Sequence, residues 1–434
     1  MPKIIIMNQG TEHTRGYDPT HSEPLRKSVG RCTWFADQGD IIISPVPVER
    51  DFLCSVADTL GFDADSVSVL VEDHLRAEGL LVPADDIRNL QARVAERGPW
   101  RIMPCFWTPD VAAFAARLGL GDPVTLAFAT QRGSDLFNRK RHFRQFAAGA
   151  SVPIPEGSIA TSVADLDRAI KRHLPRTGTV IVKKDDSAGG LGNLTLTTGS
   201  VKALPGSRDT REIGDARARP ASIWEELTDL HSRALVVEAY YDISHSFYFE
   251  YFIGGDGLPL FLHSGDIRFR TPDDANATEL VWVGLDTPTE LPHFSLANAL
   301  TLTERLVALA AQIGCRGHIN IDAIVTTEGE LLFIESNMRW GGGTSLHTVG
   351  QRLLGPRFAD EHALSLVRDV KCPPRPEAVR ALSERGLQFS PSSREGVIIL
   401  ASDEYKPGAM ECLLIGQNRL RVRELEVALR GVLG

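Results

Sequence analysis

The sequence predicts a protein of mixed α/β and α+β class, with an N-terminal parallel α/β layer, a larger central unit and a small C-terminal cap. Three observations favour this fold. The chain has 434 residues, too many for a single hydrophobic core. Its first 125 or so residues alternate apolar strand-like runs with helical patterns. Two later segments, 179–198 and 320–339, have the pattern of β-hairpins.

The composition is that of an ordinary globular protein. Hydrophobic residues make up 43% of the chain and the mean hydropathy is −0.10. The net charge of −9 offers no basic footprint, which argues against nucleic acid or an anionic membrane as the main partner. The six cysteines have no CxxC pair and no zinc spacing, so we expect reduced thiols in a cytoplasmic protein. The apolar run at residues 4–7 is too short for a signal peptide or a membrane span and predicts a first strand.

The first 130 residues predict a series of alternating elements. A loop, Asn8 to Thr11, follows the first strand at the edge where open α/β sheets bind ligands, although a plain turn is the favoured interpretation. We expect strands at 3–7, 40–45, 66–70 and 124–130, and helices at 48–60, 83–97 and 109–118.

The segment 320–339, NIDAIVTTEGELLFIESNMR, predicts a hairpin with an acidic face. A two-residue turn at Glu328-Gly329 would place Asp322 opposite Glu335. Because side chains alternate along a strand, the same register puts Asn320 opposite Asn337 on that face. The apolar side chains on the other face would be Ile319, Ile321, Ala323 and Val325.

Directly opposed carboxylates repel each other, so a sheet that pairs Asp322 with Glu335 favours a cation between them. Carboxylate and amide oxygens are the ligands that Mg²⁺ prefers, and Asn337 supplies the amide. The alternative is that this face is the solvated outer face of an amphipathic hairpin.

A second hairpin is closed by a glycine loop, SAGGLGN at 187–193. The loop lies between two β-rich runs, which excludes the strand–loop–helix context of the Walker A and Rossmann motifs. Gly189, Gly190 and Gly192 would leave backbone N–H groups free to approach a polyphosphate. Lys183, on the entering strand, would hold phosphate oxygens. A mobile hairpin tip is the alternative.

The segment between the two hairpins contains three further candidates. Residues 203–222 are rich in charges and turn formers and predict a long exposed excursion or lid. Glu238, followed by Tyr240, suits a strand that runs into an adenine pocket, although the tyrosines could equally be core. Arg268 and Arg270 share one face of a strand and could meet anionic groups or form a surface ladder.

After the acidic hairpin, RWGGGTS at 339–345 predicts an anion site. Three glycines precede a helix that we expect to begin near Thr344, and Arg339 adds a positive charge before it. A helix over 296–312 should precede the hairpin. The prolines of 370–376 predict a linker, followed by a strand at 396–402, a turn at 406–408 and a final helix.

In chain order these residues resemble the ATP-grasp carboxylate–amine ligases over 126–370. The resemblance implies that ATP and two Mg²⁺ ions are the cofactors. The matching positions are Lys140, Lys183, the glycine hairpin, Glu238, Asp322, Glu335, Asn337 and Arg339.

The resemblance also implies a role for each matching residue. Lys140, Lys183, Ser187 and the loop glycines would hold the phosphates, and Glu238, Ala239 and Tyr240 would contact adenine. Asp322, Glu335 and Asn337 would bind the metal ions. Arg339, with Gly343, Thr344 and Ser345, would hold the acyl phosphate and the amine, and Arg339 and Lys183 would be the catalytic residues. Two positions depart from the family pattern: Arg139 stands where an acid usually precedes the first lysine, and His245 replaces the acid that often grips the ribose.

The resemblance further implies domains at 1–125 (pre-ATP-grasp), 126–370 (ATP-grasp) and 371–434 (cap). This order is most similar to the pheganomycin-type peptide ligases of bacterial secondary metabolism. We therefore expect an ADP-forming ligase that joins a carboxylate to an amine, with small-molecule or peptide substrates as partners and a homodimer as one option. A carboxylate must first be activated by phosphoryl transfer because its own leaving group is oxide. The alternatives are a kinase or dikinase on the same fold and a non-catalytic ATP-binding scaffold.

Overall fold

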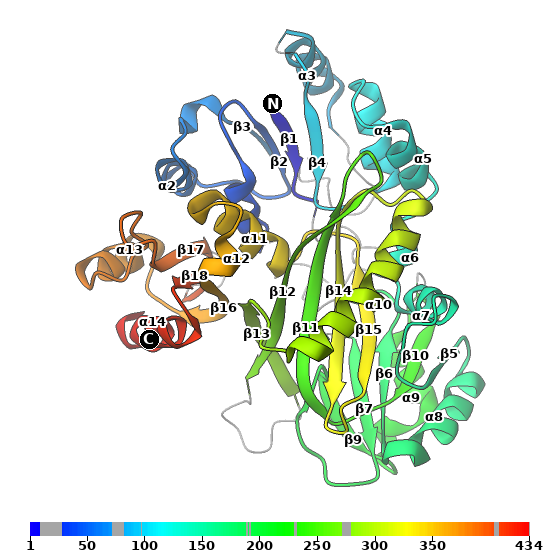
Figure 1. Ribbon diagram of the computed structural model, residues 1–434. Helices are drawn as coiled ribbons and strands as arrows, with labels where there is room; N and C mark the ends of the chain where they lie inside the picture. The colour runs from blue at the N-terminus through cyan, green and yellow to red at the C-terminus, as the bar shows by residue number, and fades with distance from the viewer. Residues whose placement is uncertain are drawn as a thin grey trace.

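A computed structural model describes residues 1–8, 28–71, 82–96, 98–187, 190, 192–229, 232–270, 279–402 and 408–433. Three sheets organise these residues, and each belongs to one region of the chain (Figure 1). The mixed α/β and α+β class is confirmed, with a parallel sheet at the N-terminus and a large antiparallel sheet after it.

The N-terminal sheet is parallel and buried on both faces. One face packs against α3 (Ala84–Glu96) and α4 (Pro109–Arg117), and the other packs against α2 (Arg50–Leu60). This double burial explains why its strands are continuous apolar runs. In sheet order the strands are β3 (Ser68–Val71), β2 (Ile41–Ser44), β1 (Lys3–Ile6) and β4 (Arg101–Pro104).

The expected strand at 124–130 is wrong, because Pro123–Thr130 forms helix α5. Asp122 caps the helix by accepting hydrogen bonds from the backbone N–H groups of Val124 and Thr125. Pro123 occupies the first turn, where its missing N–H costs nothing. The Asp-Pro start signal therefore outweighs the β propensity of the apolar run.

The middle of the chain forms a five-stranded sheet that carries the glycine hairpin. Helices α8 (Val163–Thr177) and α9 (Pro220–Leu227) pack on one face of this sheet. Lys183 and Glu238 project from the other face, because they alternate with Val182 and Val237 of the packed core. In sheet order the strands are β5 (Gly157–Ala160), β10 (Leu235–Ala239), β6 (Thr179–Lys184), β7 (Asn193–Thr197) and β9 (Asp209–Glu212).

The predicted exposed excursion at 203–222 is also corrected. This segment contains β8 (Leu204–Pro205), β9, a 3-10 turn η4 (Ala216–Ala218) and the start of α9. Its charges pair with one another: Arg211 lies 2.8 Å from Asp209 and 2.9 Å from Glu226. The pairing lets a charged segment form an edge strand parallel to β7.

The large sheet dominates the molecule (Figure 1). Short β8 pairs with its strand β13. In order its strands are β15 (Leu331–Asn337), β14 (Gly317–Thr326), β11 (Ile243–Ile253), β12 (Pro259–Arg270), β13 (Glu279–Thr287), β16 (Ala363–Lys371), β18 (Ala409–Gly416) and β17 (Gly396–Ser402).

Different helices cover the two faces of the large sheet. Helix α10 (His293–Gln312) packs on Phe247 and Phe249 of β11, and α13 (Arg375–Glu384) and α14 (Arg419–Leu433) cover the same face further along. We call this side the α10 face. Helix α11 (Gly342–Leu354) packs on Leu285 and Leu366, which point to the opposite side, the α11 face.

The C-terminal part of the chain continues the large sheet. Strand β16 extends to Lys371 and α13 begins at Arg375, so the predicted linker at 370–376 shrinks to three residues. The predicted strand at 396–402 and the final helix are confirmed, whereas the turn at 406–408 lies largely outside the described residues. Strand β18 and helix α13 were not foreseen.

A 3-10 segment, η2 (Ser28–Phe35), ties the N-terminal domain to the α11 face and to the C-terminal strands. Trp34 donates a hydrogen bond to the Leu400 carbonyl oxygen, and Arg31 lies 3.0 Å from the buried Glu411 carboxylate. A second short 3-10 turn, η3 (Ala64–Ser66), precedes β3, and α12 (Phe358–Glu361) follows α11.

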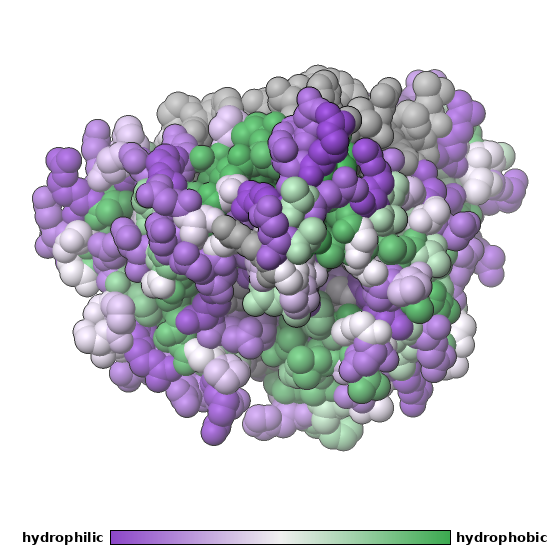
Figure 2. Space-filling view, turned by 90° about the horizontal axis from the view of Figure 1, so that it is seen from above, coloured by the Kyte–Doolittle hydropathy of each residue, from purple (hydrophilic) through white to green (hydrophobic). Residues whose placement is uncertain are grey.

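Seen from above, the surface alternates hydrophilic residues with smaller hydrophobic areas (Figure 2). None of the helices in the described ranges is long and apolar enough to cross a membrane.

Candidate active site

The acidic hairpin has the predicted register at its four polar positions. Asp322 of β14 lies opposite Glu335 of β15, and Asn320 lies opposite Asn337. Ile319 and Ile321 point to the α10 face and are buried in its core. The four polar side chains therefore lie on the α11 face, as predicted.

The turn that closes the hairpin differs from the prediction. Thr326, not Thr327, faces Glu330, and the Thr326 N–H donates to the Glu330 carbonyl oxygen, so the loop has three residues. Gly329 has φ of +86°, as such a loop requires. A bulge at Ile334 of β15, opposite Asp322 and Ala323, then restores the register by one residue.

Neighbouring cationic side chains neutralise the two opposed carboxylates only in part. Burial and the facing Glu335 carboxylate raise the pKa of Asp322 well above its usual range. Burial opposes ionisation of Glu335 too, but Lys140 and then Lys183 outweigh it and lower the pKa of Glu335 to about 2. The Lys140 Nζ lies 3.2 Å from the Glu335 carboxylate. Arg339 offsets only part of the effect on Asp322, whose pKa stays raised.

This donor set fits a magnesium ion. Asp322 and Glu335 are hard oxygen ligands, and the Asn337 amide lies 3.4 Å from Asp322, with its oxygen available by rotation of the amide. A dication would relieve the repulsion that raises the pKa of Asp322. Among the described residues no cluster of three or more His, Cys, Asp or Glu side chains has a metal-binding arrangement, and metal binding by Asp322, Glu335 and Asn337 stays a prediction.

Lys140 links the hairpin to the glycine loop. It begins α7 (Lys140–Gly149), and its buried ammonium also donates to the Ser187 carbonyl oxygen at 2.5 Å. Its backbone N–H donates to the Asp185 carbonyl oxygen. The preceding Arg139 pairs with Asp135, Asp185 and Asp186 and so belongs to the frame of the loop.

Lys183 and Glu238 form a buried ionic group on the facing sheet. The Lys183 ammonium lies 2.6 Å from the Glu238 carboxylate, and Arg144 of α7 lies 2.5 Å from the same carboxylate. Burial would raise the pKa of Glu238, but Lys183 and Arg144 lower it below its usual value. The Glu238 backbone also pairs with β5 and β6, so this residue is held in the middle of its sheet.

The glycine loop is partly described. Gly190 has φ of +77°, and a Cβ on Gly192 would collide with Ser187 and Lys184, so both positions need glycine. Gly189 lies outside the described residues. The loop follows β6 directly and therefore lies next to Lys183, as predicted.

The segment after β10 is packed inside the protein. Ala239 is buried, and the Tyr240 hydroxyl donates to the Pro205 carbonyl oxygen. Burial raises the pKa of Tyr240, so this hydroxyl stays neutral. The adenine contacts expected at these residues remain a prediction.

Arg339 lies between the hairpin and the glycine loop. Its guanidinium donates to the Asn138 side-chain oxygen at 3.0 Å, and Asn138 ends α6 (Asp135–Asn138). The same oxygen accepts from the Met338 N–H. A small pocket opens here, lined by Phe106, Asp135, Asn138, Arg139, Asp186, Ser187 and Arg339. It joins the N-terminal domain, the loop and the hairpin.

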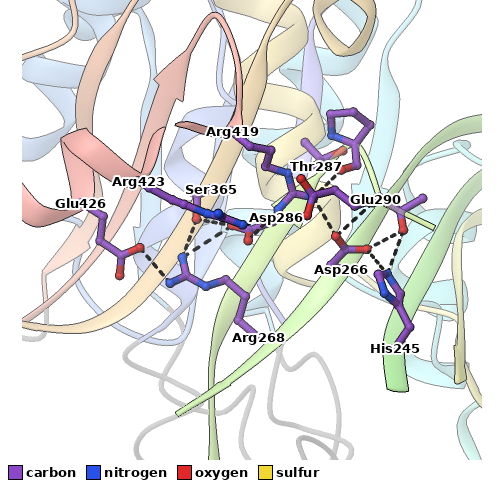
Figure 3. Close-up of polar contacts among 12 residues, drawn as sticks. His245, Asp266, Arg268, Asp286, Thr287, Glu290, Ser365, Arg419, Arg423 and Glu426 are labelled. Carbon is purple, nitrogen blue, oxygen red and sulfur yellow. Dashed lines mark hydrogen bonds and ion pairs between the residues drawn. The ribbon is translucent and has the colours of Figure 1, made fainter. Parts of the chain in front are cut away.

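Two predicted residues lie on the opposite side of the large sheet (Figure 3). His245 pairs with Val325 and contacts Asp266 at 2.8 Å, on the α10 face. Arg268 contacts Ser365 and Glu426 there, both at 2.8 Å. The structure does not bring either residue to the carboxylates of β14 and β15. The side chain of Arg270 lies outside the described residues.

The predicted anion site at the start of α11 is closed. The helix begins at Gly342, two residues earlier than expected, and Gly343, Thr344 and Ser345 are all buried. The Thr344 hydroxyl donates to a buried carboxylate, Glu250 of β11, at 2.5 Å.

Three residues of this region were not foreseen: Arg144, Asn138 and Glu250. Arg144 lies one helical turn after Lys140 on the same buried side of α7, a spacing that the sequence does carry. Asn138 and Glu250 carry no such pattern, because their roles arise from contacts with residues about 70 or more positions away.

Two family models match parts of the chain. A model described as the pre ATP-grasp domain matches residues 29–120, and one described as the PGM1 C-terminal domain matches residues 377–429. A search of curated protein sequences finds no match.

Solved structures resemble the whole chain. The N5-carboxyaminoimidazole ribonucleotide synthetase from Thermus thermophilus is 12% identical, with a TM-score of 0.57 over 100% of this chain and 98% of that chain. The biotin carboxylase from Campylobacter jejuni, solved with an ATP analogue, is 14% identical, with a TM-score of 0.56 over 100% and 91%. The biotin carboxylase domain of Hydrogenobacter thermophilus 2-oxoglutarate carboxylase, a dimer solved with MgADP and bicarbonate, is 15% identical, with a TM-score of 0.57 over 98% and 89%.

These matches establish the fold. The parallel N-terminal sheet corresponds to the pre-ATP-grasp model, and the likeness to the synthetase and the carboxylases extends over nearly the full length of each chain. Residues 29–120 match the pre ATP-grasp model, and the chain as a whole has the fold of this synthetase and these carboxylases.

Proposed function

We propose that the protein is an ATP-dependent ligase that activates a carboxylate as an acyl phosphate and transfers the acyl group to an amine, with release of ADP and phosphate. The observation that carries the proposal is the uncompensated carboxylate pair, Asp322 and Glu335, beside Lys140 and Arg339. Such a pair needs a cation, and the neighbouring cationic side chains suit phosphate.

The residues with proposed roles in the reaction lie on two facing sheets. ATP bound with Mg²⁺ supplies the phosphoryl group that activates the carboxylate. Asp322, Glu335 and Asn337 hold the metal ions from the large sheet. Lys183 on the facing sheet, and Lys140 between them, neutralise phosphate oxygens and hold them in line for transfer.

Arg339 and the glycine loop act at the reacting centre. Asn138 fixes the Arg339 guanidinium, which stabilises charge on the transferring group. The glycine loop next to Lys183 would exclude water, which would otherwise hydrolyse the acyl phosphate. An amine with an ordinary pKa near 8 needs little help from a base.

A narrower assignment is peptide ligation of the pheganomycin type in bacterial secondary metabolism. The support for it is the arrangement along the chain, with a match to the pre ATP-grasp model before the core and a match to the PGM1 C-terminal model after it. The substrates would then be amino acids or peptides, and the products would be new amides.

Incubation with Mg-ATP and pools of amino acids and peptides tests the proposal. Mass spectrometry should find ADP, phosphate and a new amide, and hydroxylamine offered in place of the amine should give a hydroxamate. The matched control is Glu335→Gln, which should give none of these. Phosphate transfer to a hydroxyl without any amide or hydroxamate would contradict the proposal and favour a kinase.

A further inference from the structure

Glu250 is a fully buried carboxylate beside the proposed metal site. It lies on the α11 face of β11 and has 0% exposure. Across the sheet Glu250, Asn320 and Asn337 form one row, and Tyr248, Asp322 and Glu335 form the next. The site described above gives Glu250 no role.

Three groups from two elements hold this carboxylate. The Thr344 hydroxyl of α11 donates to its Oε1 at 2.5 Å, and the Asn320 amide of β14 donates to its Oε2 at 3.3 Å. The His318 ring, also on β14, lies 3.4 Å from Oε1. A buried anion is stable only with such partners. Glu250 therefore ties the start of α11 to the strand that carries Asp322.

The start of α11 is built around this contact. The Thr344 hydroxyl also accepts a hydrogen bond from the Gly341 N–H at 2.9 Å. A Cβ on Gly343 would lie 2.8 Å from the Tyr248 ring and 3.1 Å from Glu250 Oε2, so glycine lets the helix end lie directly on the sheet. The positive end of a helix attracts an anion, and here that anion is Glu250.

We propose that Glu250 is a positioning residue of the ligase: it serves as an internal anion that docks the start of α11 on the metal-binding strands. The docked segment, Asn337 to Thr344, includes Asn337 itself and Arg339. A second consequence concerns substrate recognition. Because Glu250 already fills the anion site at Thr344, a substrate carboxylate is bound elsewhere. The kinetic part of this proposal rests on the proposed ligase function, whereas the docking contact does not.

Glu250→Ala with added formate tests the contact directly. The substitution leaves Thr344 and Asn320 without their acceptor, and we expect the melting temperature to fall by about 3–6 °C. Formate can fill the vacated carboxylate position and should raise the melting temperature of this variant in a saturable way. Wild-type protein and Glu328→Ala, which removes an exposed turn carboxylate, should not respond.

Kinetics separate positioning from a purely structural role. Well below the melting temperature, Glu250→Ala should lower kcat about a hundred-fold with KM for ATP changed less than about two-fold, and formate should restore kcat. Glu250→Gln keeps the shape but turns one acceptor into a donor that faces Asn320. It should fold and lose about ten-fold in kcat.

Several outcomes would overturn the proposal. These are wild-type kcat in Glu250→Gln, an unchanged melting temperature in Glu250→Ala, or a formate response no larger than that of the wild type. If Glu250→Ala does not fold, the kcat of Glu250→Gln tests the proposal instead. If the wild-type protein joins no carboxylate to any amine, the ligase proposal fails, while the formate effect on melting still tests the docking contact.

Discussion

The large sheet carries two pairs of directly opposed carboxylates, one on each face. On the α11 face Asp322 lies opposite Glu335, and on the α10 face Asp266 lies opposite Asp286. Both pairs join neighbouring antiparallel strands of the same sheet. The repulsion between opposed carboxylates would therefore favour a cation at either pair.

The pair on the α10 face is neutralised by the protein itself (Figure 3). Arg419 of α14 lies 2.8 Å from Asp266 and 2.6 Å from Asp286, and His245 and Arg268 complete the group. Burial would raise the pKa of Asp266, but the hydrogen bonds from its neighbours and the charge of Arg419 lower it.

On the α11 face the described cationic side chains offset the charge of the carboxylate pair only in part. Lys140 contacts Glu335, while the pKa of Asp322 remains raised. The comparison shows that opposed carboxylates alone do not predict a metal site. What distinguishes the two pairs is whether side-chain cations cancel the charge, and only the pair with a deficit is suited to a dication.

The largest expected effect is on turnover. Glu335→Gln and Asn337→Ala should each lower kcat by about 10²–10³-fold or more, because both residues would hold the metal ions that neutralise the transferring phosphoryl group. Product formation measured by mass spectrometry checks this, with circular dichroism to confirm folding. Wild-type turnover in either variant would remove the hairpin from the active site.

On the other face the expected effect is on stability. Arg419→Ala leaves two largely buried carboxylates facing each other and should destabilise the protein by about 3 kcal/mol. Arg423→Ala is the matched control, because that side chain is 69% exposed and its contact with Glu290 is 3.9 Å long. Denaturant unfolding compares the two, and equal losses would show that Arg419 does not neutralise the pair.

The same variant has a predictable pH dependence. The pKa of Asp266 is lower in the folded protein, so its ion pairs stabilise the fold fully above the unfolded pKa of about 3.9. That stability is lost as the pH falls through the lower folded value. The difference in stability between wild type and Arg419→Ala should therefore shrink below about pH 4. A difference that grows on acidification would contradict this sign.

A smaller effect is expected at the facing sheet. Lys183→Ala should raise KM for ATP and lower kcat together, with about a ten- to hundred-fold loss in kcat/KM, because a phosphate contact serves both binding and transfer. Arg144 still pairs with Glu238 in this variant, so the fold should survive. Steady-state kinetics test the prediction, and a change confined to KM for the organic substrates would place ATP elsewhere.

The smallest effect is expected for Asp322→Asn without metal. Burial and the facing Glu335 already oppose ionisation of Asp322, and the Asn amide keeps the shape of a neutral carboxyl group, so stability should stay within about 1 kcal/mol of the wild type or rise slightly. Unfolding in chelator-treated buffer measures it. A loss like that of Arg419→Ala would mean that Asp322 is already neutralised.

Local patterns predicted much of this molecule. The alternation along β14 correctly placed Asn320 and Asp322 on the face opposite Ile319 and Ile321, and the glycine hairpin was correct because its flanking runs are strongly β-forming. The register was right partly because two errors cancelled. The turn has three residues, and the bulge at Ile334 shifts the pairing back. Side-chain alternation carries no information about such a bulge.

The remaining site residues depended on contacts that the sequence does not display. A bulge at Ser244 helps to determine on which face of the sheet His245 lies. Arg268 contacts residues of β16 and α14, which lie far along the chain. Thr344 follows three glycines, as an open anion site would, but the helix docks on Glu250. Tertiary packing decided which of these groups are free to bind a ligand.

Divalent-cation binding tests the comparison most directly. Titration of Mn²⁺ can be followed by electron paramagnetic resonance, with Mg²⁺ as competitor, in the wild type, Asp322→Asn and Asp286→Asn at a temperature where all three are folded. The account predicts that the wild type and Asp286→Asn bind the ion and that Asp322→Asn binds it at least about ten-fold more weakly. Equal binding by Asp322→Asn, or loss of binding in Asp286→Asn alone, would contradict it.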